Sequence, residues 1–180
     1  MVQIRTKTRT EQILTVMNIL AWVAFIGFSI EAGALMISYG ISFVNPEGAK
    51  NFYKGLDLFS LRETRFWDYT GVVSFMVAVA ILKSTVWMQV IKVTSKINLV
   101  NPFTMEIASI LEKISYSLFS IWLVGMLSNG YTQWLEKNTG VDYYGKFVQG
   151  EFIFMAGLVF IISQIFKRGV EIQSENELTV

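Results

Sequence analysis

Four long apolar stretches constrain the fold of this chain more than any other feature of its sequence. A helix needs about 20 predominantly apolar residues to cross the hydrocarbon core of a membrane. We place these stretches at about 19–44, 69–90, 114–134 and 147–166. Hydrophobic residues make up 53% of the 180 positions and charged residues 16%, so the chain is too apolar for an ordinary soluble domain. The sequence predicts an all-α integral membrane four-helix bundle that forms one domain, residues 1–180.

The connecting segments and their charges predict the topology. The first stretch is too long for the core of a signal peptide, so we expect it to be retained as a span. Outer loops are expected at about 45–68 and 135–149, a cytoplasmic connector at about 91–113 and a cytoplasmic tail at 167–180. The aromatic and apolar residues of the first loop favour a place on the membrane surface. Basic residues near the span ends predict that both termini are cytoplasmic.

Helix start and stop signals border the third and fourth spans. Asn101 followed by Pro102 is typical of a helix start, because Asn can cap free N–H groups and Pro loses nothing at the first helical position. Gly169, after two basic residues, is typical of a helix end. We therefore expect the third helix to begin near Asn101 and the chain beyond Gly169 to form a polar tail.

A weak internal repeat relates the two halves of the chain. At an offset of 90 residues, five positions in each half are identical: Met36, Ser38, Gly40, Tyr53 and Gly55 match Met126, Ser128, Gly130, Tyr143 and Gly145. This pattern predicts two tandem helical hairpins related by an axis along the membrane normal. The alternative is that any pair of hairpins with similar loops shows such matches.

Two absent residue types exclude much chemistry. The chain has no Cys and no His, which excludes disulfides, thiolate catalysis, iron–sulfur clusters, His-ligated haem and Ser-His pairs. It also lacks a P-loop and a G-x-S-x-G motif. We expect no enzyme activity, no metal and no cofactor. The net charge is only +1 and the basic residues are scattered, which argues against direct contact with nucleic acid.

Glu31 and Lys83 are the candidate functional residues among the ionisable groups inside the predicted spans. Such residues face the bundle interior, a water-filled cavity or each other, because facing lipid costs several kcal/mol. Both lie at similar depths, so we hypothesise an intramembrane ion pair, with Ser29, Ser84 and Thr85 as further partners. The functional interpretation is a relay or a ligand-sensitive latch. The structural alternatives are a pair that fixes helix register and a Lys83 that snorkels to the surface.

Aromatic residues form a second candidate site near the outer surface. Membrane proteins concentrate Trp and Tyr at both interfaces, and this anchoring role explains most of them. A binding pocket is the alternative, and its candidate residues are Trp67, Tyr69, Tyr131, Trp134, Tyr143 and Tyr144.

Two motifs resemble those of a known family. The first is Asn101-Pro102-Phe103-Thr104 with Glu106, and the second runs from Phe166-Lys167-Arg168-Gly169 to Glu175-Asn176-Glu177-Leu178-Thr179-Val180. With four similarly spaced spans, they resemble the bacterial membrane proteins catalogued as domain of unknown function 2975. In that family the first motif often continues with Asn and a basic residue, whereas Ile107 follows here. The resemblance implies a multi-pass protein of the bacterial inner membrane.

The resemblance also implies a partner, because members of the family are commonly encoded beside a small helix-turn-helix regulator. A cytoplasmic surface made by the first motif and the tail would contact it. The candidate contact residues are Asn101, Pro102, Phe103, Glu106, Glu175, Asn176, Leu178 and Thr179. The tail ends in a short β-prone apolar strip suited to docking, and an inert terminus is the alternative.

Two functions from different classes remain after these exclusions. The first is a non-enzymatic sensor or regulatory membrane protein that acts with a cytoplasmic partner. The second is a small transporter, channel or immunity-type protein whose Glu31 and Lys83 line a pathway. A structural subunit of a larger complex is a third reading.

Overall fold

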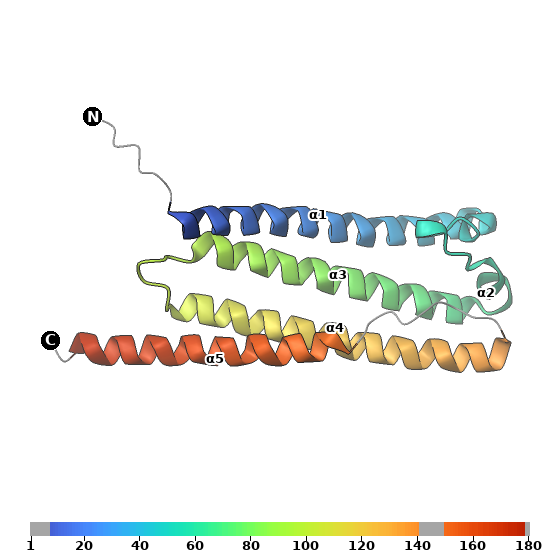
Figure 1. Cartoon of the computed structure of the whole chain (residues 1–180). Helices are drawn as coiled ribbons and strands as arrows, with labels where there is room; N and C mark the ends of the chain where they lie inside the picture. Colours follow the sequence, from blue (N-terminus) through green and yellow to red (C-terminus); the bar gives the residue numbers. More distant parts are fainter. Residues whose placement is uncertain (1–7, 141–149, 179–180) are drawn as a thin grey trace, which may run out of the picture.

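Long helices make up most of the computed structural model, which describes residues 8–140 and 150–178, with side chains to Asn176 (Figure 1). The elements are α1 (Arg9–Val44), η1 (Pro46–Ala49), η2 (Tyr53–Gly55), α2 (Phe59–Thr64), α3 (Phe66–Lys96), α4 (Met105–Thr139) and α5 (Glu151–Leu178). Among them α1, α3, α4 and α5 are long and apolar enough to cross a membrane. The predicted all-α fold with four spans is confirmed. The sidedness of the termini stays a prediction.

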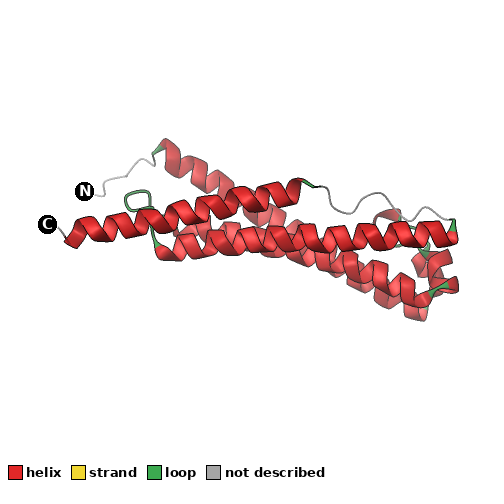
Figure 2. Ribbon diagram, turned by 90° about the horizontal axis from the view of Figure 1, so that it is seen from below, coloured by secondary structure: helices red, strands yellow, loops and turns green. Residues whose placement is uncertain are grey.

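The four long helices form an open bundle in which each packs on its neighbour in chain order. Helix α1 packs on α3, α3 on α4 and α4 on α5, while within residues 8–140 and 150–178 α1 contacts neither α4 nor α5. Figures 1 and 2 show the resulting row, which consists of two tandem hairpins. One end of the row holds the start of α1, residues 97–104 and the end of α5, and we call it the connector end. The opposite end, with residues 45–65, is the loop end.

Helix α5 is shifted along the row toward the connector end. Its first turn packs opposite the middle of α4, where Phe152 joins a cluster with Ile121 and Val124. Figure 1 shows that its last turns extend past the start of α4. The end of α5 therefore projects beyond the start of α4, where no other described helix lies beside it.

The third long helix begins later than its sequence predicts. Thr104 caps α4, and its side chain accepts a hydrogen bond from the backbone N–H of Ile107. Asn101 does not cap this helix, because its side chain accepts a hydrogen bond from Gln173 on α5 instead. The expected start at Asn101 and Pro102 is therefore wrong by a few residues, since a tertiary contact takes the side chain that local sequence assigns to the cap.

The expected helix end at Gly169 is also wrong. Helix α5 continues to Leu178, and Gly169 lies within it without the positive φ of a glycine cap. An ion pair between Arg168 and Glu171, one turn apart, supports the continuation at 2.7 Å. The polar tail is therefore helical as far as Leu178, and Thr179 and Val180 of the predicted β-prone strip lie outside the described residues.

Hydrogen-bonded side chains hold α1 against α3 along their length. Lipid tails give helices no hydrophobic reason to associate, so membrane interfaces rely on close packing and on such bonds. The bonds join Asn18 to Thr94 at 2.7 Å, Ser29 to Ser84 at 2.8 Å, Tyr39 to Thr70 at 3.0 Å, and Tyr69 to Ser42 at 2.9 Å. Both helices are thereby fixed in register from the connector end to the loop end.

Part of the first outer loop is buried. Phe52, Leu58 and Leu61 have almost no exposed surface and pack around Tyr69 at the start of α3. The segment thus folds back onto the α1–α3 hairpin, rather than resting wholly on the membrane surface as its composition suggested. Its aromatic residues build a small core at the loop end.

The buried hydroxyl of Tyr69 provides a test of this packing. Replacing Tyr69 with Phe removes its bond to Ser42, and we expect the free energy of unfolding to fall by about 1 kcal/mol. Reversible unfolding in mixed micelles measures the change. The control is Tyr116→Phe, at a tyrosine that is 57% exposed and whose hydroxyl makes only a long 3.4 Å hydrogen bond to Glu112, with an expected change below about 0.5 kcal/mol. Equal effects at the two sites would contradict a packed loop end.

Candidate functional site

The charged side chains of Glu31 and Lys83, both within predicted spans, do not pair directly with each other. The Glu31 carboxylate lies 3.3 Å from the Lys54 amine, and the two side chains are 27% and 63% exposed. Lys83 instead places its amine over the ring of Phe28, 5.5 Å from the ring centre. Within the described residues, the partner of Glu31 therefore comes from the loop that folds back over the hairpin and not from the neighbouring span.

Glu31 and Lys83 nevertheless line the same small cavity between α1 and α3. Its volume is about 110 Å³, and Leu35, Met76, Val79 and Ala80 complete its wall. Of the further partners expected for the pair, Ser29 bonds Ser84, and Thr85 donates to the backbone carbonyl of Ile81. Glu31 and Lys83 thus line one cavity but do not form a hydrogen bond with each other.

The loop residue that reaches Glu31 has an unusual backbone. Lys54 has φ 61°, in the left-handed region that residues other than glycine rarely adopt. Its amine also lies 5.2 Å from the ring centre of Tyr53. Sequence reasoning missed this partner because the fold of the loop, and not any local pattern, brings Lys54 to α1.

The candidate aromatic pocket is only partly assembled. Tyr131 and Trp134 stack with ring centres 6.1 Å apart, and Tyr131 donates a 2.7 Å hydrogen bond to Asp68. Arg65 joins them, since it pairs with Asp68 at 2.8 Å and lies over the Trp134 ring. Trp67 is 81% exposed and packs against Phe66 instead. Tyr143 and Tyr144 lie outside the described residues, and Tyr69 belongs to the buried core.

The clearest site lies at the connector end, where the two sequence motifs meet. Phe103 lies on Gly169 so closely that a Cβ atom there would be 2.6 Å from the ring carbon Cδ1. The same ring makes an edge contact with Phe166, with 5.2 Å between ring centres. One turn further on, Gln173 donates a 2.6 Å hydrogen bond to Asn101. The connector thus packs closely on α5, because Gly169 has no side chain that would keep Phe103 away from the helix.

This contact leaves an open hollow of about 620 Å³, which we call the α5 groove. The groove lies between residues 100–103 and one side of α5. Ile165 and Ile172 give it an apolar floor, and Arg168 and Asn176 provide polar groups. Its lining includes four of the predicted partner-contact residues, namely Asn101, Pro102, Phe103 and Asn176.

The other predicted contact residues lie around the groove or beyond the described side chains. Glu106 forms an ion pair with Lys96 across the connector. Glu175 is exposed on the last turns of α5. The side chain of Leu178 and the whole of Thr179 are outside the described part of the chain. The site is therefore a surface of the first motif and α5, with Glu106 bracing the connector.

An ion pair that sequence reasoning missed joins α4 and α5 just inside the connector end. Lys167 lies 2.8 Å from the Glu112 carboxylate, and both side chains are less than a third exposed. Tyr116 donates to the same carboxylate at 3.4 Å. Each of these two residues borders an apolar span in the sequence, but only the tertiary structure shows that they lie opposite each other.

The fold and this end surface define the class of protein. The chain is a multi-pass membrane protein with four candidate spans in two tandem hairpins. Its sequence matches the model of the family described as "Protein of unknown function (DUF2975)" over residues 42–180, and the chain belongs to that family. No curated protein and no solved structure matches it. Both motifs of the connector end lie within the matched range.

The contact between Phe103 and Gly169 gives a sharp prediction. Alanine is favoured over glycine in a helix by about 1 kcal/mol, so Gly157→Ala, at an open position of α5, should leave stability unchanged or raise it. Gly169→Ala should instead destabilise the protein by about 1–3 kcal/mol, because its Cβ collides with Phe103. Unfolding in mixed micelles measures both variants.

A second substitution distinguishes this contact from a general effect on α5. Shortening Phe103 to Ala in the Gly169→Ala background should recover part of the lost stability, although Phe103→Ala alone is destabilising. If Gly169→Ala behaved like Gly157→Ala, the connector would not pack on α5 as described.

A double-mutant cycle tests the partner of Glu31. Glu31→Gln should couple to Lys54→Met by no more than about 1 kcal/mol, because Lys54 is largely exposed. Its coupling to Lys83→Met should be smaller, since that amine does not contact the carboxylate. Unfolding free energies of the single and double variants give both values. A larger coupling to Lys83 would restore the pair predicted from sequence.

Proposed function

We propose that this chain is a non-enzymatic regulatory membrane protein that binds a cytoplasmic partner in the α5 groove. The observation that carries the proposal is the meeting of the two motifs. Phe103 and Asn101 from the first motif contact Gly169 and Gln173 on α5, and the groove lies along that contact. Residues far apart in sequence are thus combined into one surface at the end of the bundle.

The chemistry of the groove suits a short segment of another protein. Its apolar floor offers hydrophobic burial, and the polar groups of Arg168 and Asn176 can fix the orientation of a bound peptide. The end of α5 projects past the start of α4 (Figure 1), and in this proposal it lies in the cytoplasm, where its sides are accessible to such a segment. A partner that approaches from the water therefore reaches the groove directly.

The kind of partner follows from the family. The resemblance implies a small helix-turn-helix regulator, which the membrane protein would hold or release in response to a signal. In this proposal the regulator contacts DNA and this chain contacts only the regulator and the bilayer. The groove accordingly needs no basic patch of its own.

Affinity purification from native membranes tests the proposal. The tagged intact chain should recover a small DNA-binding protein, identified by mass spectrometry, and a chain truncated after Gly169 should not. The point variant Ile172→Ser, in the groove floor, should reduce recovery about tenfold or more. Its matched control is Ile13→Ser, at an exposed isoleucine of α1 near the same end, which should leave recovery unchanged.

A comparison of membrane levels shows whether each variant is still inserted. Loss of recovery at normal membrane levels supports the groove as the contact surface. Equal recovery with Ile172→Ser and Ile13→Ser, or no DNA-binding protein with any chain, would contradict the proposal.

A transport or immunity role is the second candidate, and one observation favours it. Glu31 and Lys83 line one cavity between the first two spans, as residues of a pathway would. This candidate predicts that Glu31→Gln abolishes function while truncation after Gly169 is tolerated. The regulator proposal predicts the opposite pattern, so the same two variants separate the candidates.

A further inference from the structure

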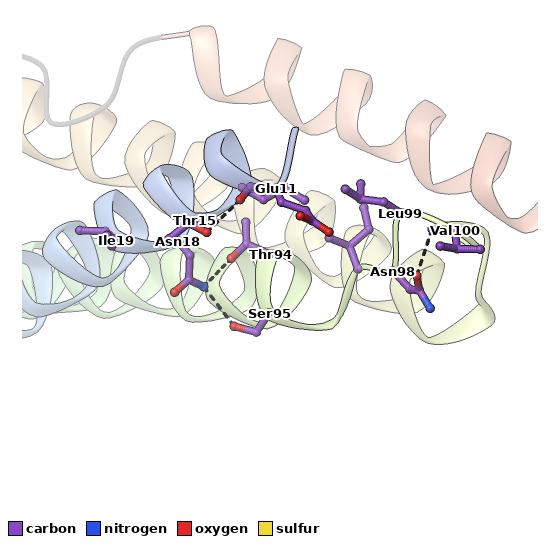
Figure 3. A pocket seen from close by; sticks show the side chains of 11 residues that line it. Glu11, Thr15, Asn18, Ile19, Thr94, Ser95, Asn98, Leu99 and Val100 are labelled. Carbon is purple, nitrogen blue, oxygen red and sulfur yellow. Dashed lines mark hydrogen bonds between the residues drawn. The ribbon is translucent and has the colours of Figure 1, made fainter. Parts of the chain in front are cut away.

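A second hollow lies at the connector end, on the other side of the connector from the α5 groove. Its volume is about 680 Å³, and the first turns of α1, the end of α3 and residues 97–100 surround it (Figure 3). The partner binding proposed for the α5 groove does not use this second hollow. We call it the α1 pocket.

One wall of the α1 pocket is polar. The Asn18 amide reaches from α1 and donates hydrogen bonds to Thr94 at 2.7 Å and to Ser95 at 3.0 Å (Figure 3). Both bonds use the amide nitrogen, and the Asn18 oxygen lies on the side away from Glu11 and Leu99 (Figure 3). The polar wall therefore consists of the hydroxyl groups of Thr94 and Ser95 and the Asn18 amide, at the end of α3.

The remaining wall is aliphatic. Leu14 and Ile19 come from α1, and Leu99 and Val100 come from the connector. Leu99 and Val100 keep 40% and 88% of their surface exposed, although both are fully apolar. An alkyl chain that covered them would bury surface that water now contacts.

The charge of the pocket is negative. Glu11 is the one ionisable residue among those that line it, and its side chain lies between α1 and the connector (Figure 3). It also completes the cap of α1, since the backbone N–H of Thr8 donates to its carboxylate at 2.8 Å. A carboxylate beside neutral oxygen atoms favours a cation that can donate hydrogen bonds.

We propose that the α1 pocket binds an amphiphile whose head carries a protonated amine. The ammonium group would donate to the Glu11 carboxylate, and the alkyl part would lie along Leu14, Ile19 and Leu99. The same chemistry has two sources, a membrane phospholipid with an ethanolamine head and a free alkylamine from the water. The position of the pocket, at the end of the spans, is open to both.

The α1 pocket also bears on the proposed function, and this part of the inference rests on that function. Val100 lines both the α1 pocket and the α5 groove, so the connector forms a shared wall. A ligand that moved residues 97–100 would change the shape of the α5 groove. Binding of a ligand in the α1 pocket would thereby alter binding of the partner in the groove. The binding experiment below uses no partner protein, so its failure leaves the α5 groove untouched.

Binding is measured on the full chain in nanodiscs of phosphatidylcholine. Native mass spectrometry of discs doped with phosphatidylethanolamine or phosphatidylglycerol shows which lipid the released protein retains. Calorimetric titration with decylamine and with decanoate, each below its critical micelle concentration, tests whether a free alkylamine from the water binds. We expect retention of the ethanolamine lipid over the glycerol lipid, or binding of decylamine over decanoate, and the pattern identifies the source.

Two variants place the ligand in the pocket. Glu11→Gln removes the charge but keeps a side chain that can complete the helix cap, and it should weaken binding about tenfold or more. Leu99→Trp should block the pocket by filling it. Glu171→Gln, an equal charge change on α5 at the same end, should leave binding unchanged. The proposal is overturned if neither amine is bound over its anionic control, or if Glu11→Gln and Leu99→Trp bind as tightly as the unaltered chain.

Discussion

Inside a membrane, helices must be held together by specific contacts, because water no longer drives their apolar faces into association. The structure depends on this constraint. Hydrogen bonds such as Ser29 to Ser84 join α1 to α3, Tyr131 bonds Asp68 between α4 and α3, and Lys167 pairs with Glu112 between α5 and α4. Close approach adds to them, since a Cβ atom on Gly71 would be 3.1 Å from the Tyr131 hydroxyl oxygen. Every neighbouring pair in the row therefore has at least one polar bond.

The open arrangement of the row makes its two ends important. Because α1 does not contact α4 or α5 within the described residues, the loop and the connector supply the remaining contacts at the two ends. At the loop end a small aromatic core around Tyr69 and the ion pair of Glu31 with Lys54 hold the returning loop. At the connector end Phe103 rests on Gly169, and the connector, through Val100, separates the α1 pocket from the α5 groove. The proposed ligand site and the proposed partner site therefore lie on either side of one short segment, as the proposed regulatory role requires.

The sequence predicted the features that depend on composition and missed those that depend on tertiary contact. Four spans followed from hydropathy alone, and the surface formed by the first motif and the region after the fourth span followed from the motifs of the family. The helix start at Asn101 and the helix end at Gly169 were wrong, because both residues serve the contact between connector and α5. A local signal cannot reveal that use. Likewise, the sequence placed Glu31 opposite Lys83 by depth, while the fold of a loop brings Lys54 to it.

Both proposed sites depend on the docking of the connector on α5 in the membrane-embedded protein, and the absence of native cysteine allows a direct test of that contact. Asn101→Cys combined with Gln173→Cys places two thiols where the native side chains share a hydrogen bond. A short bifunctional thiol reagent, applied to native membranes, should link this pair rapidly within one chain. The control pair Asn101→Cys with Ser74→Cys, on the middle part of the row, should not be linked. Failure to link the first pair, with both thiols shown to be reactive, would contradict the docked connector and the groove built on it.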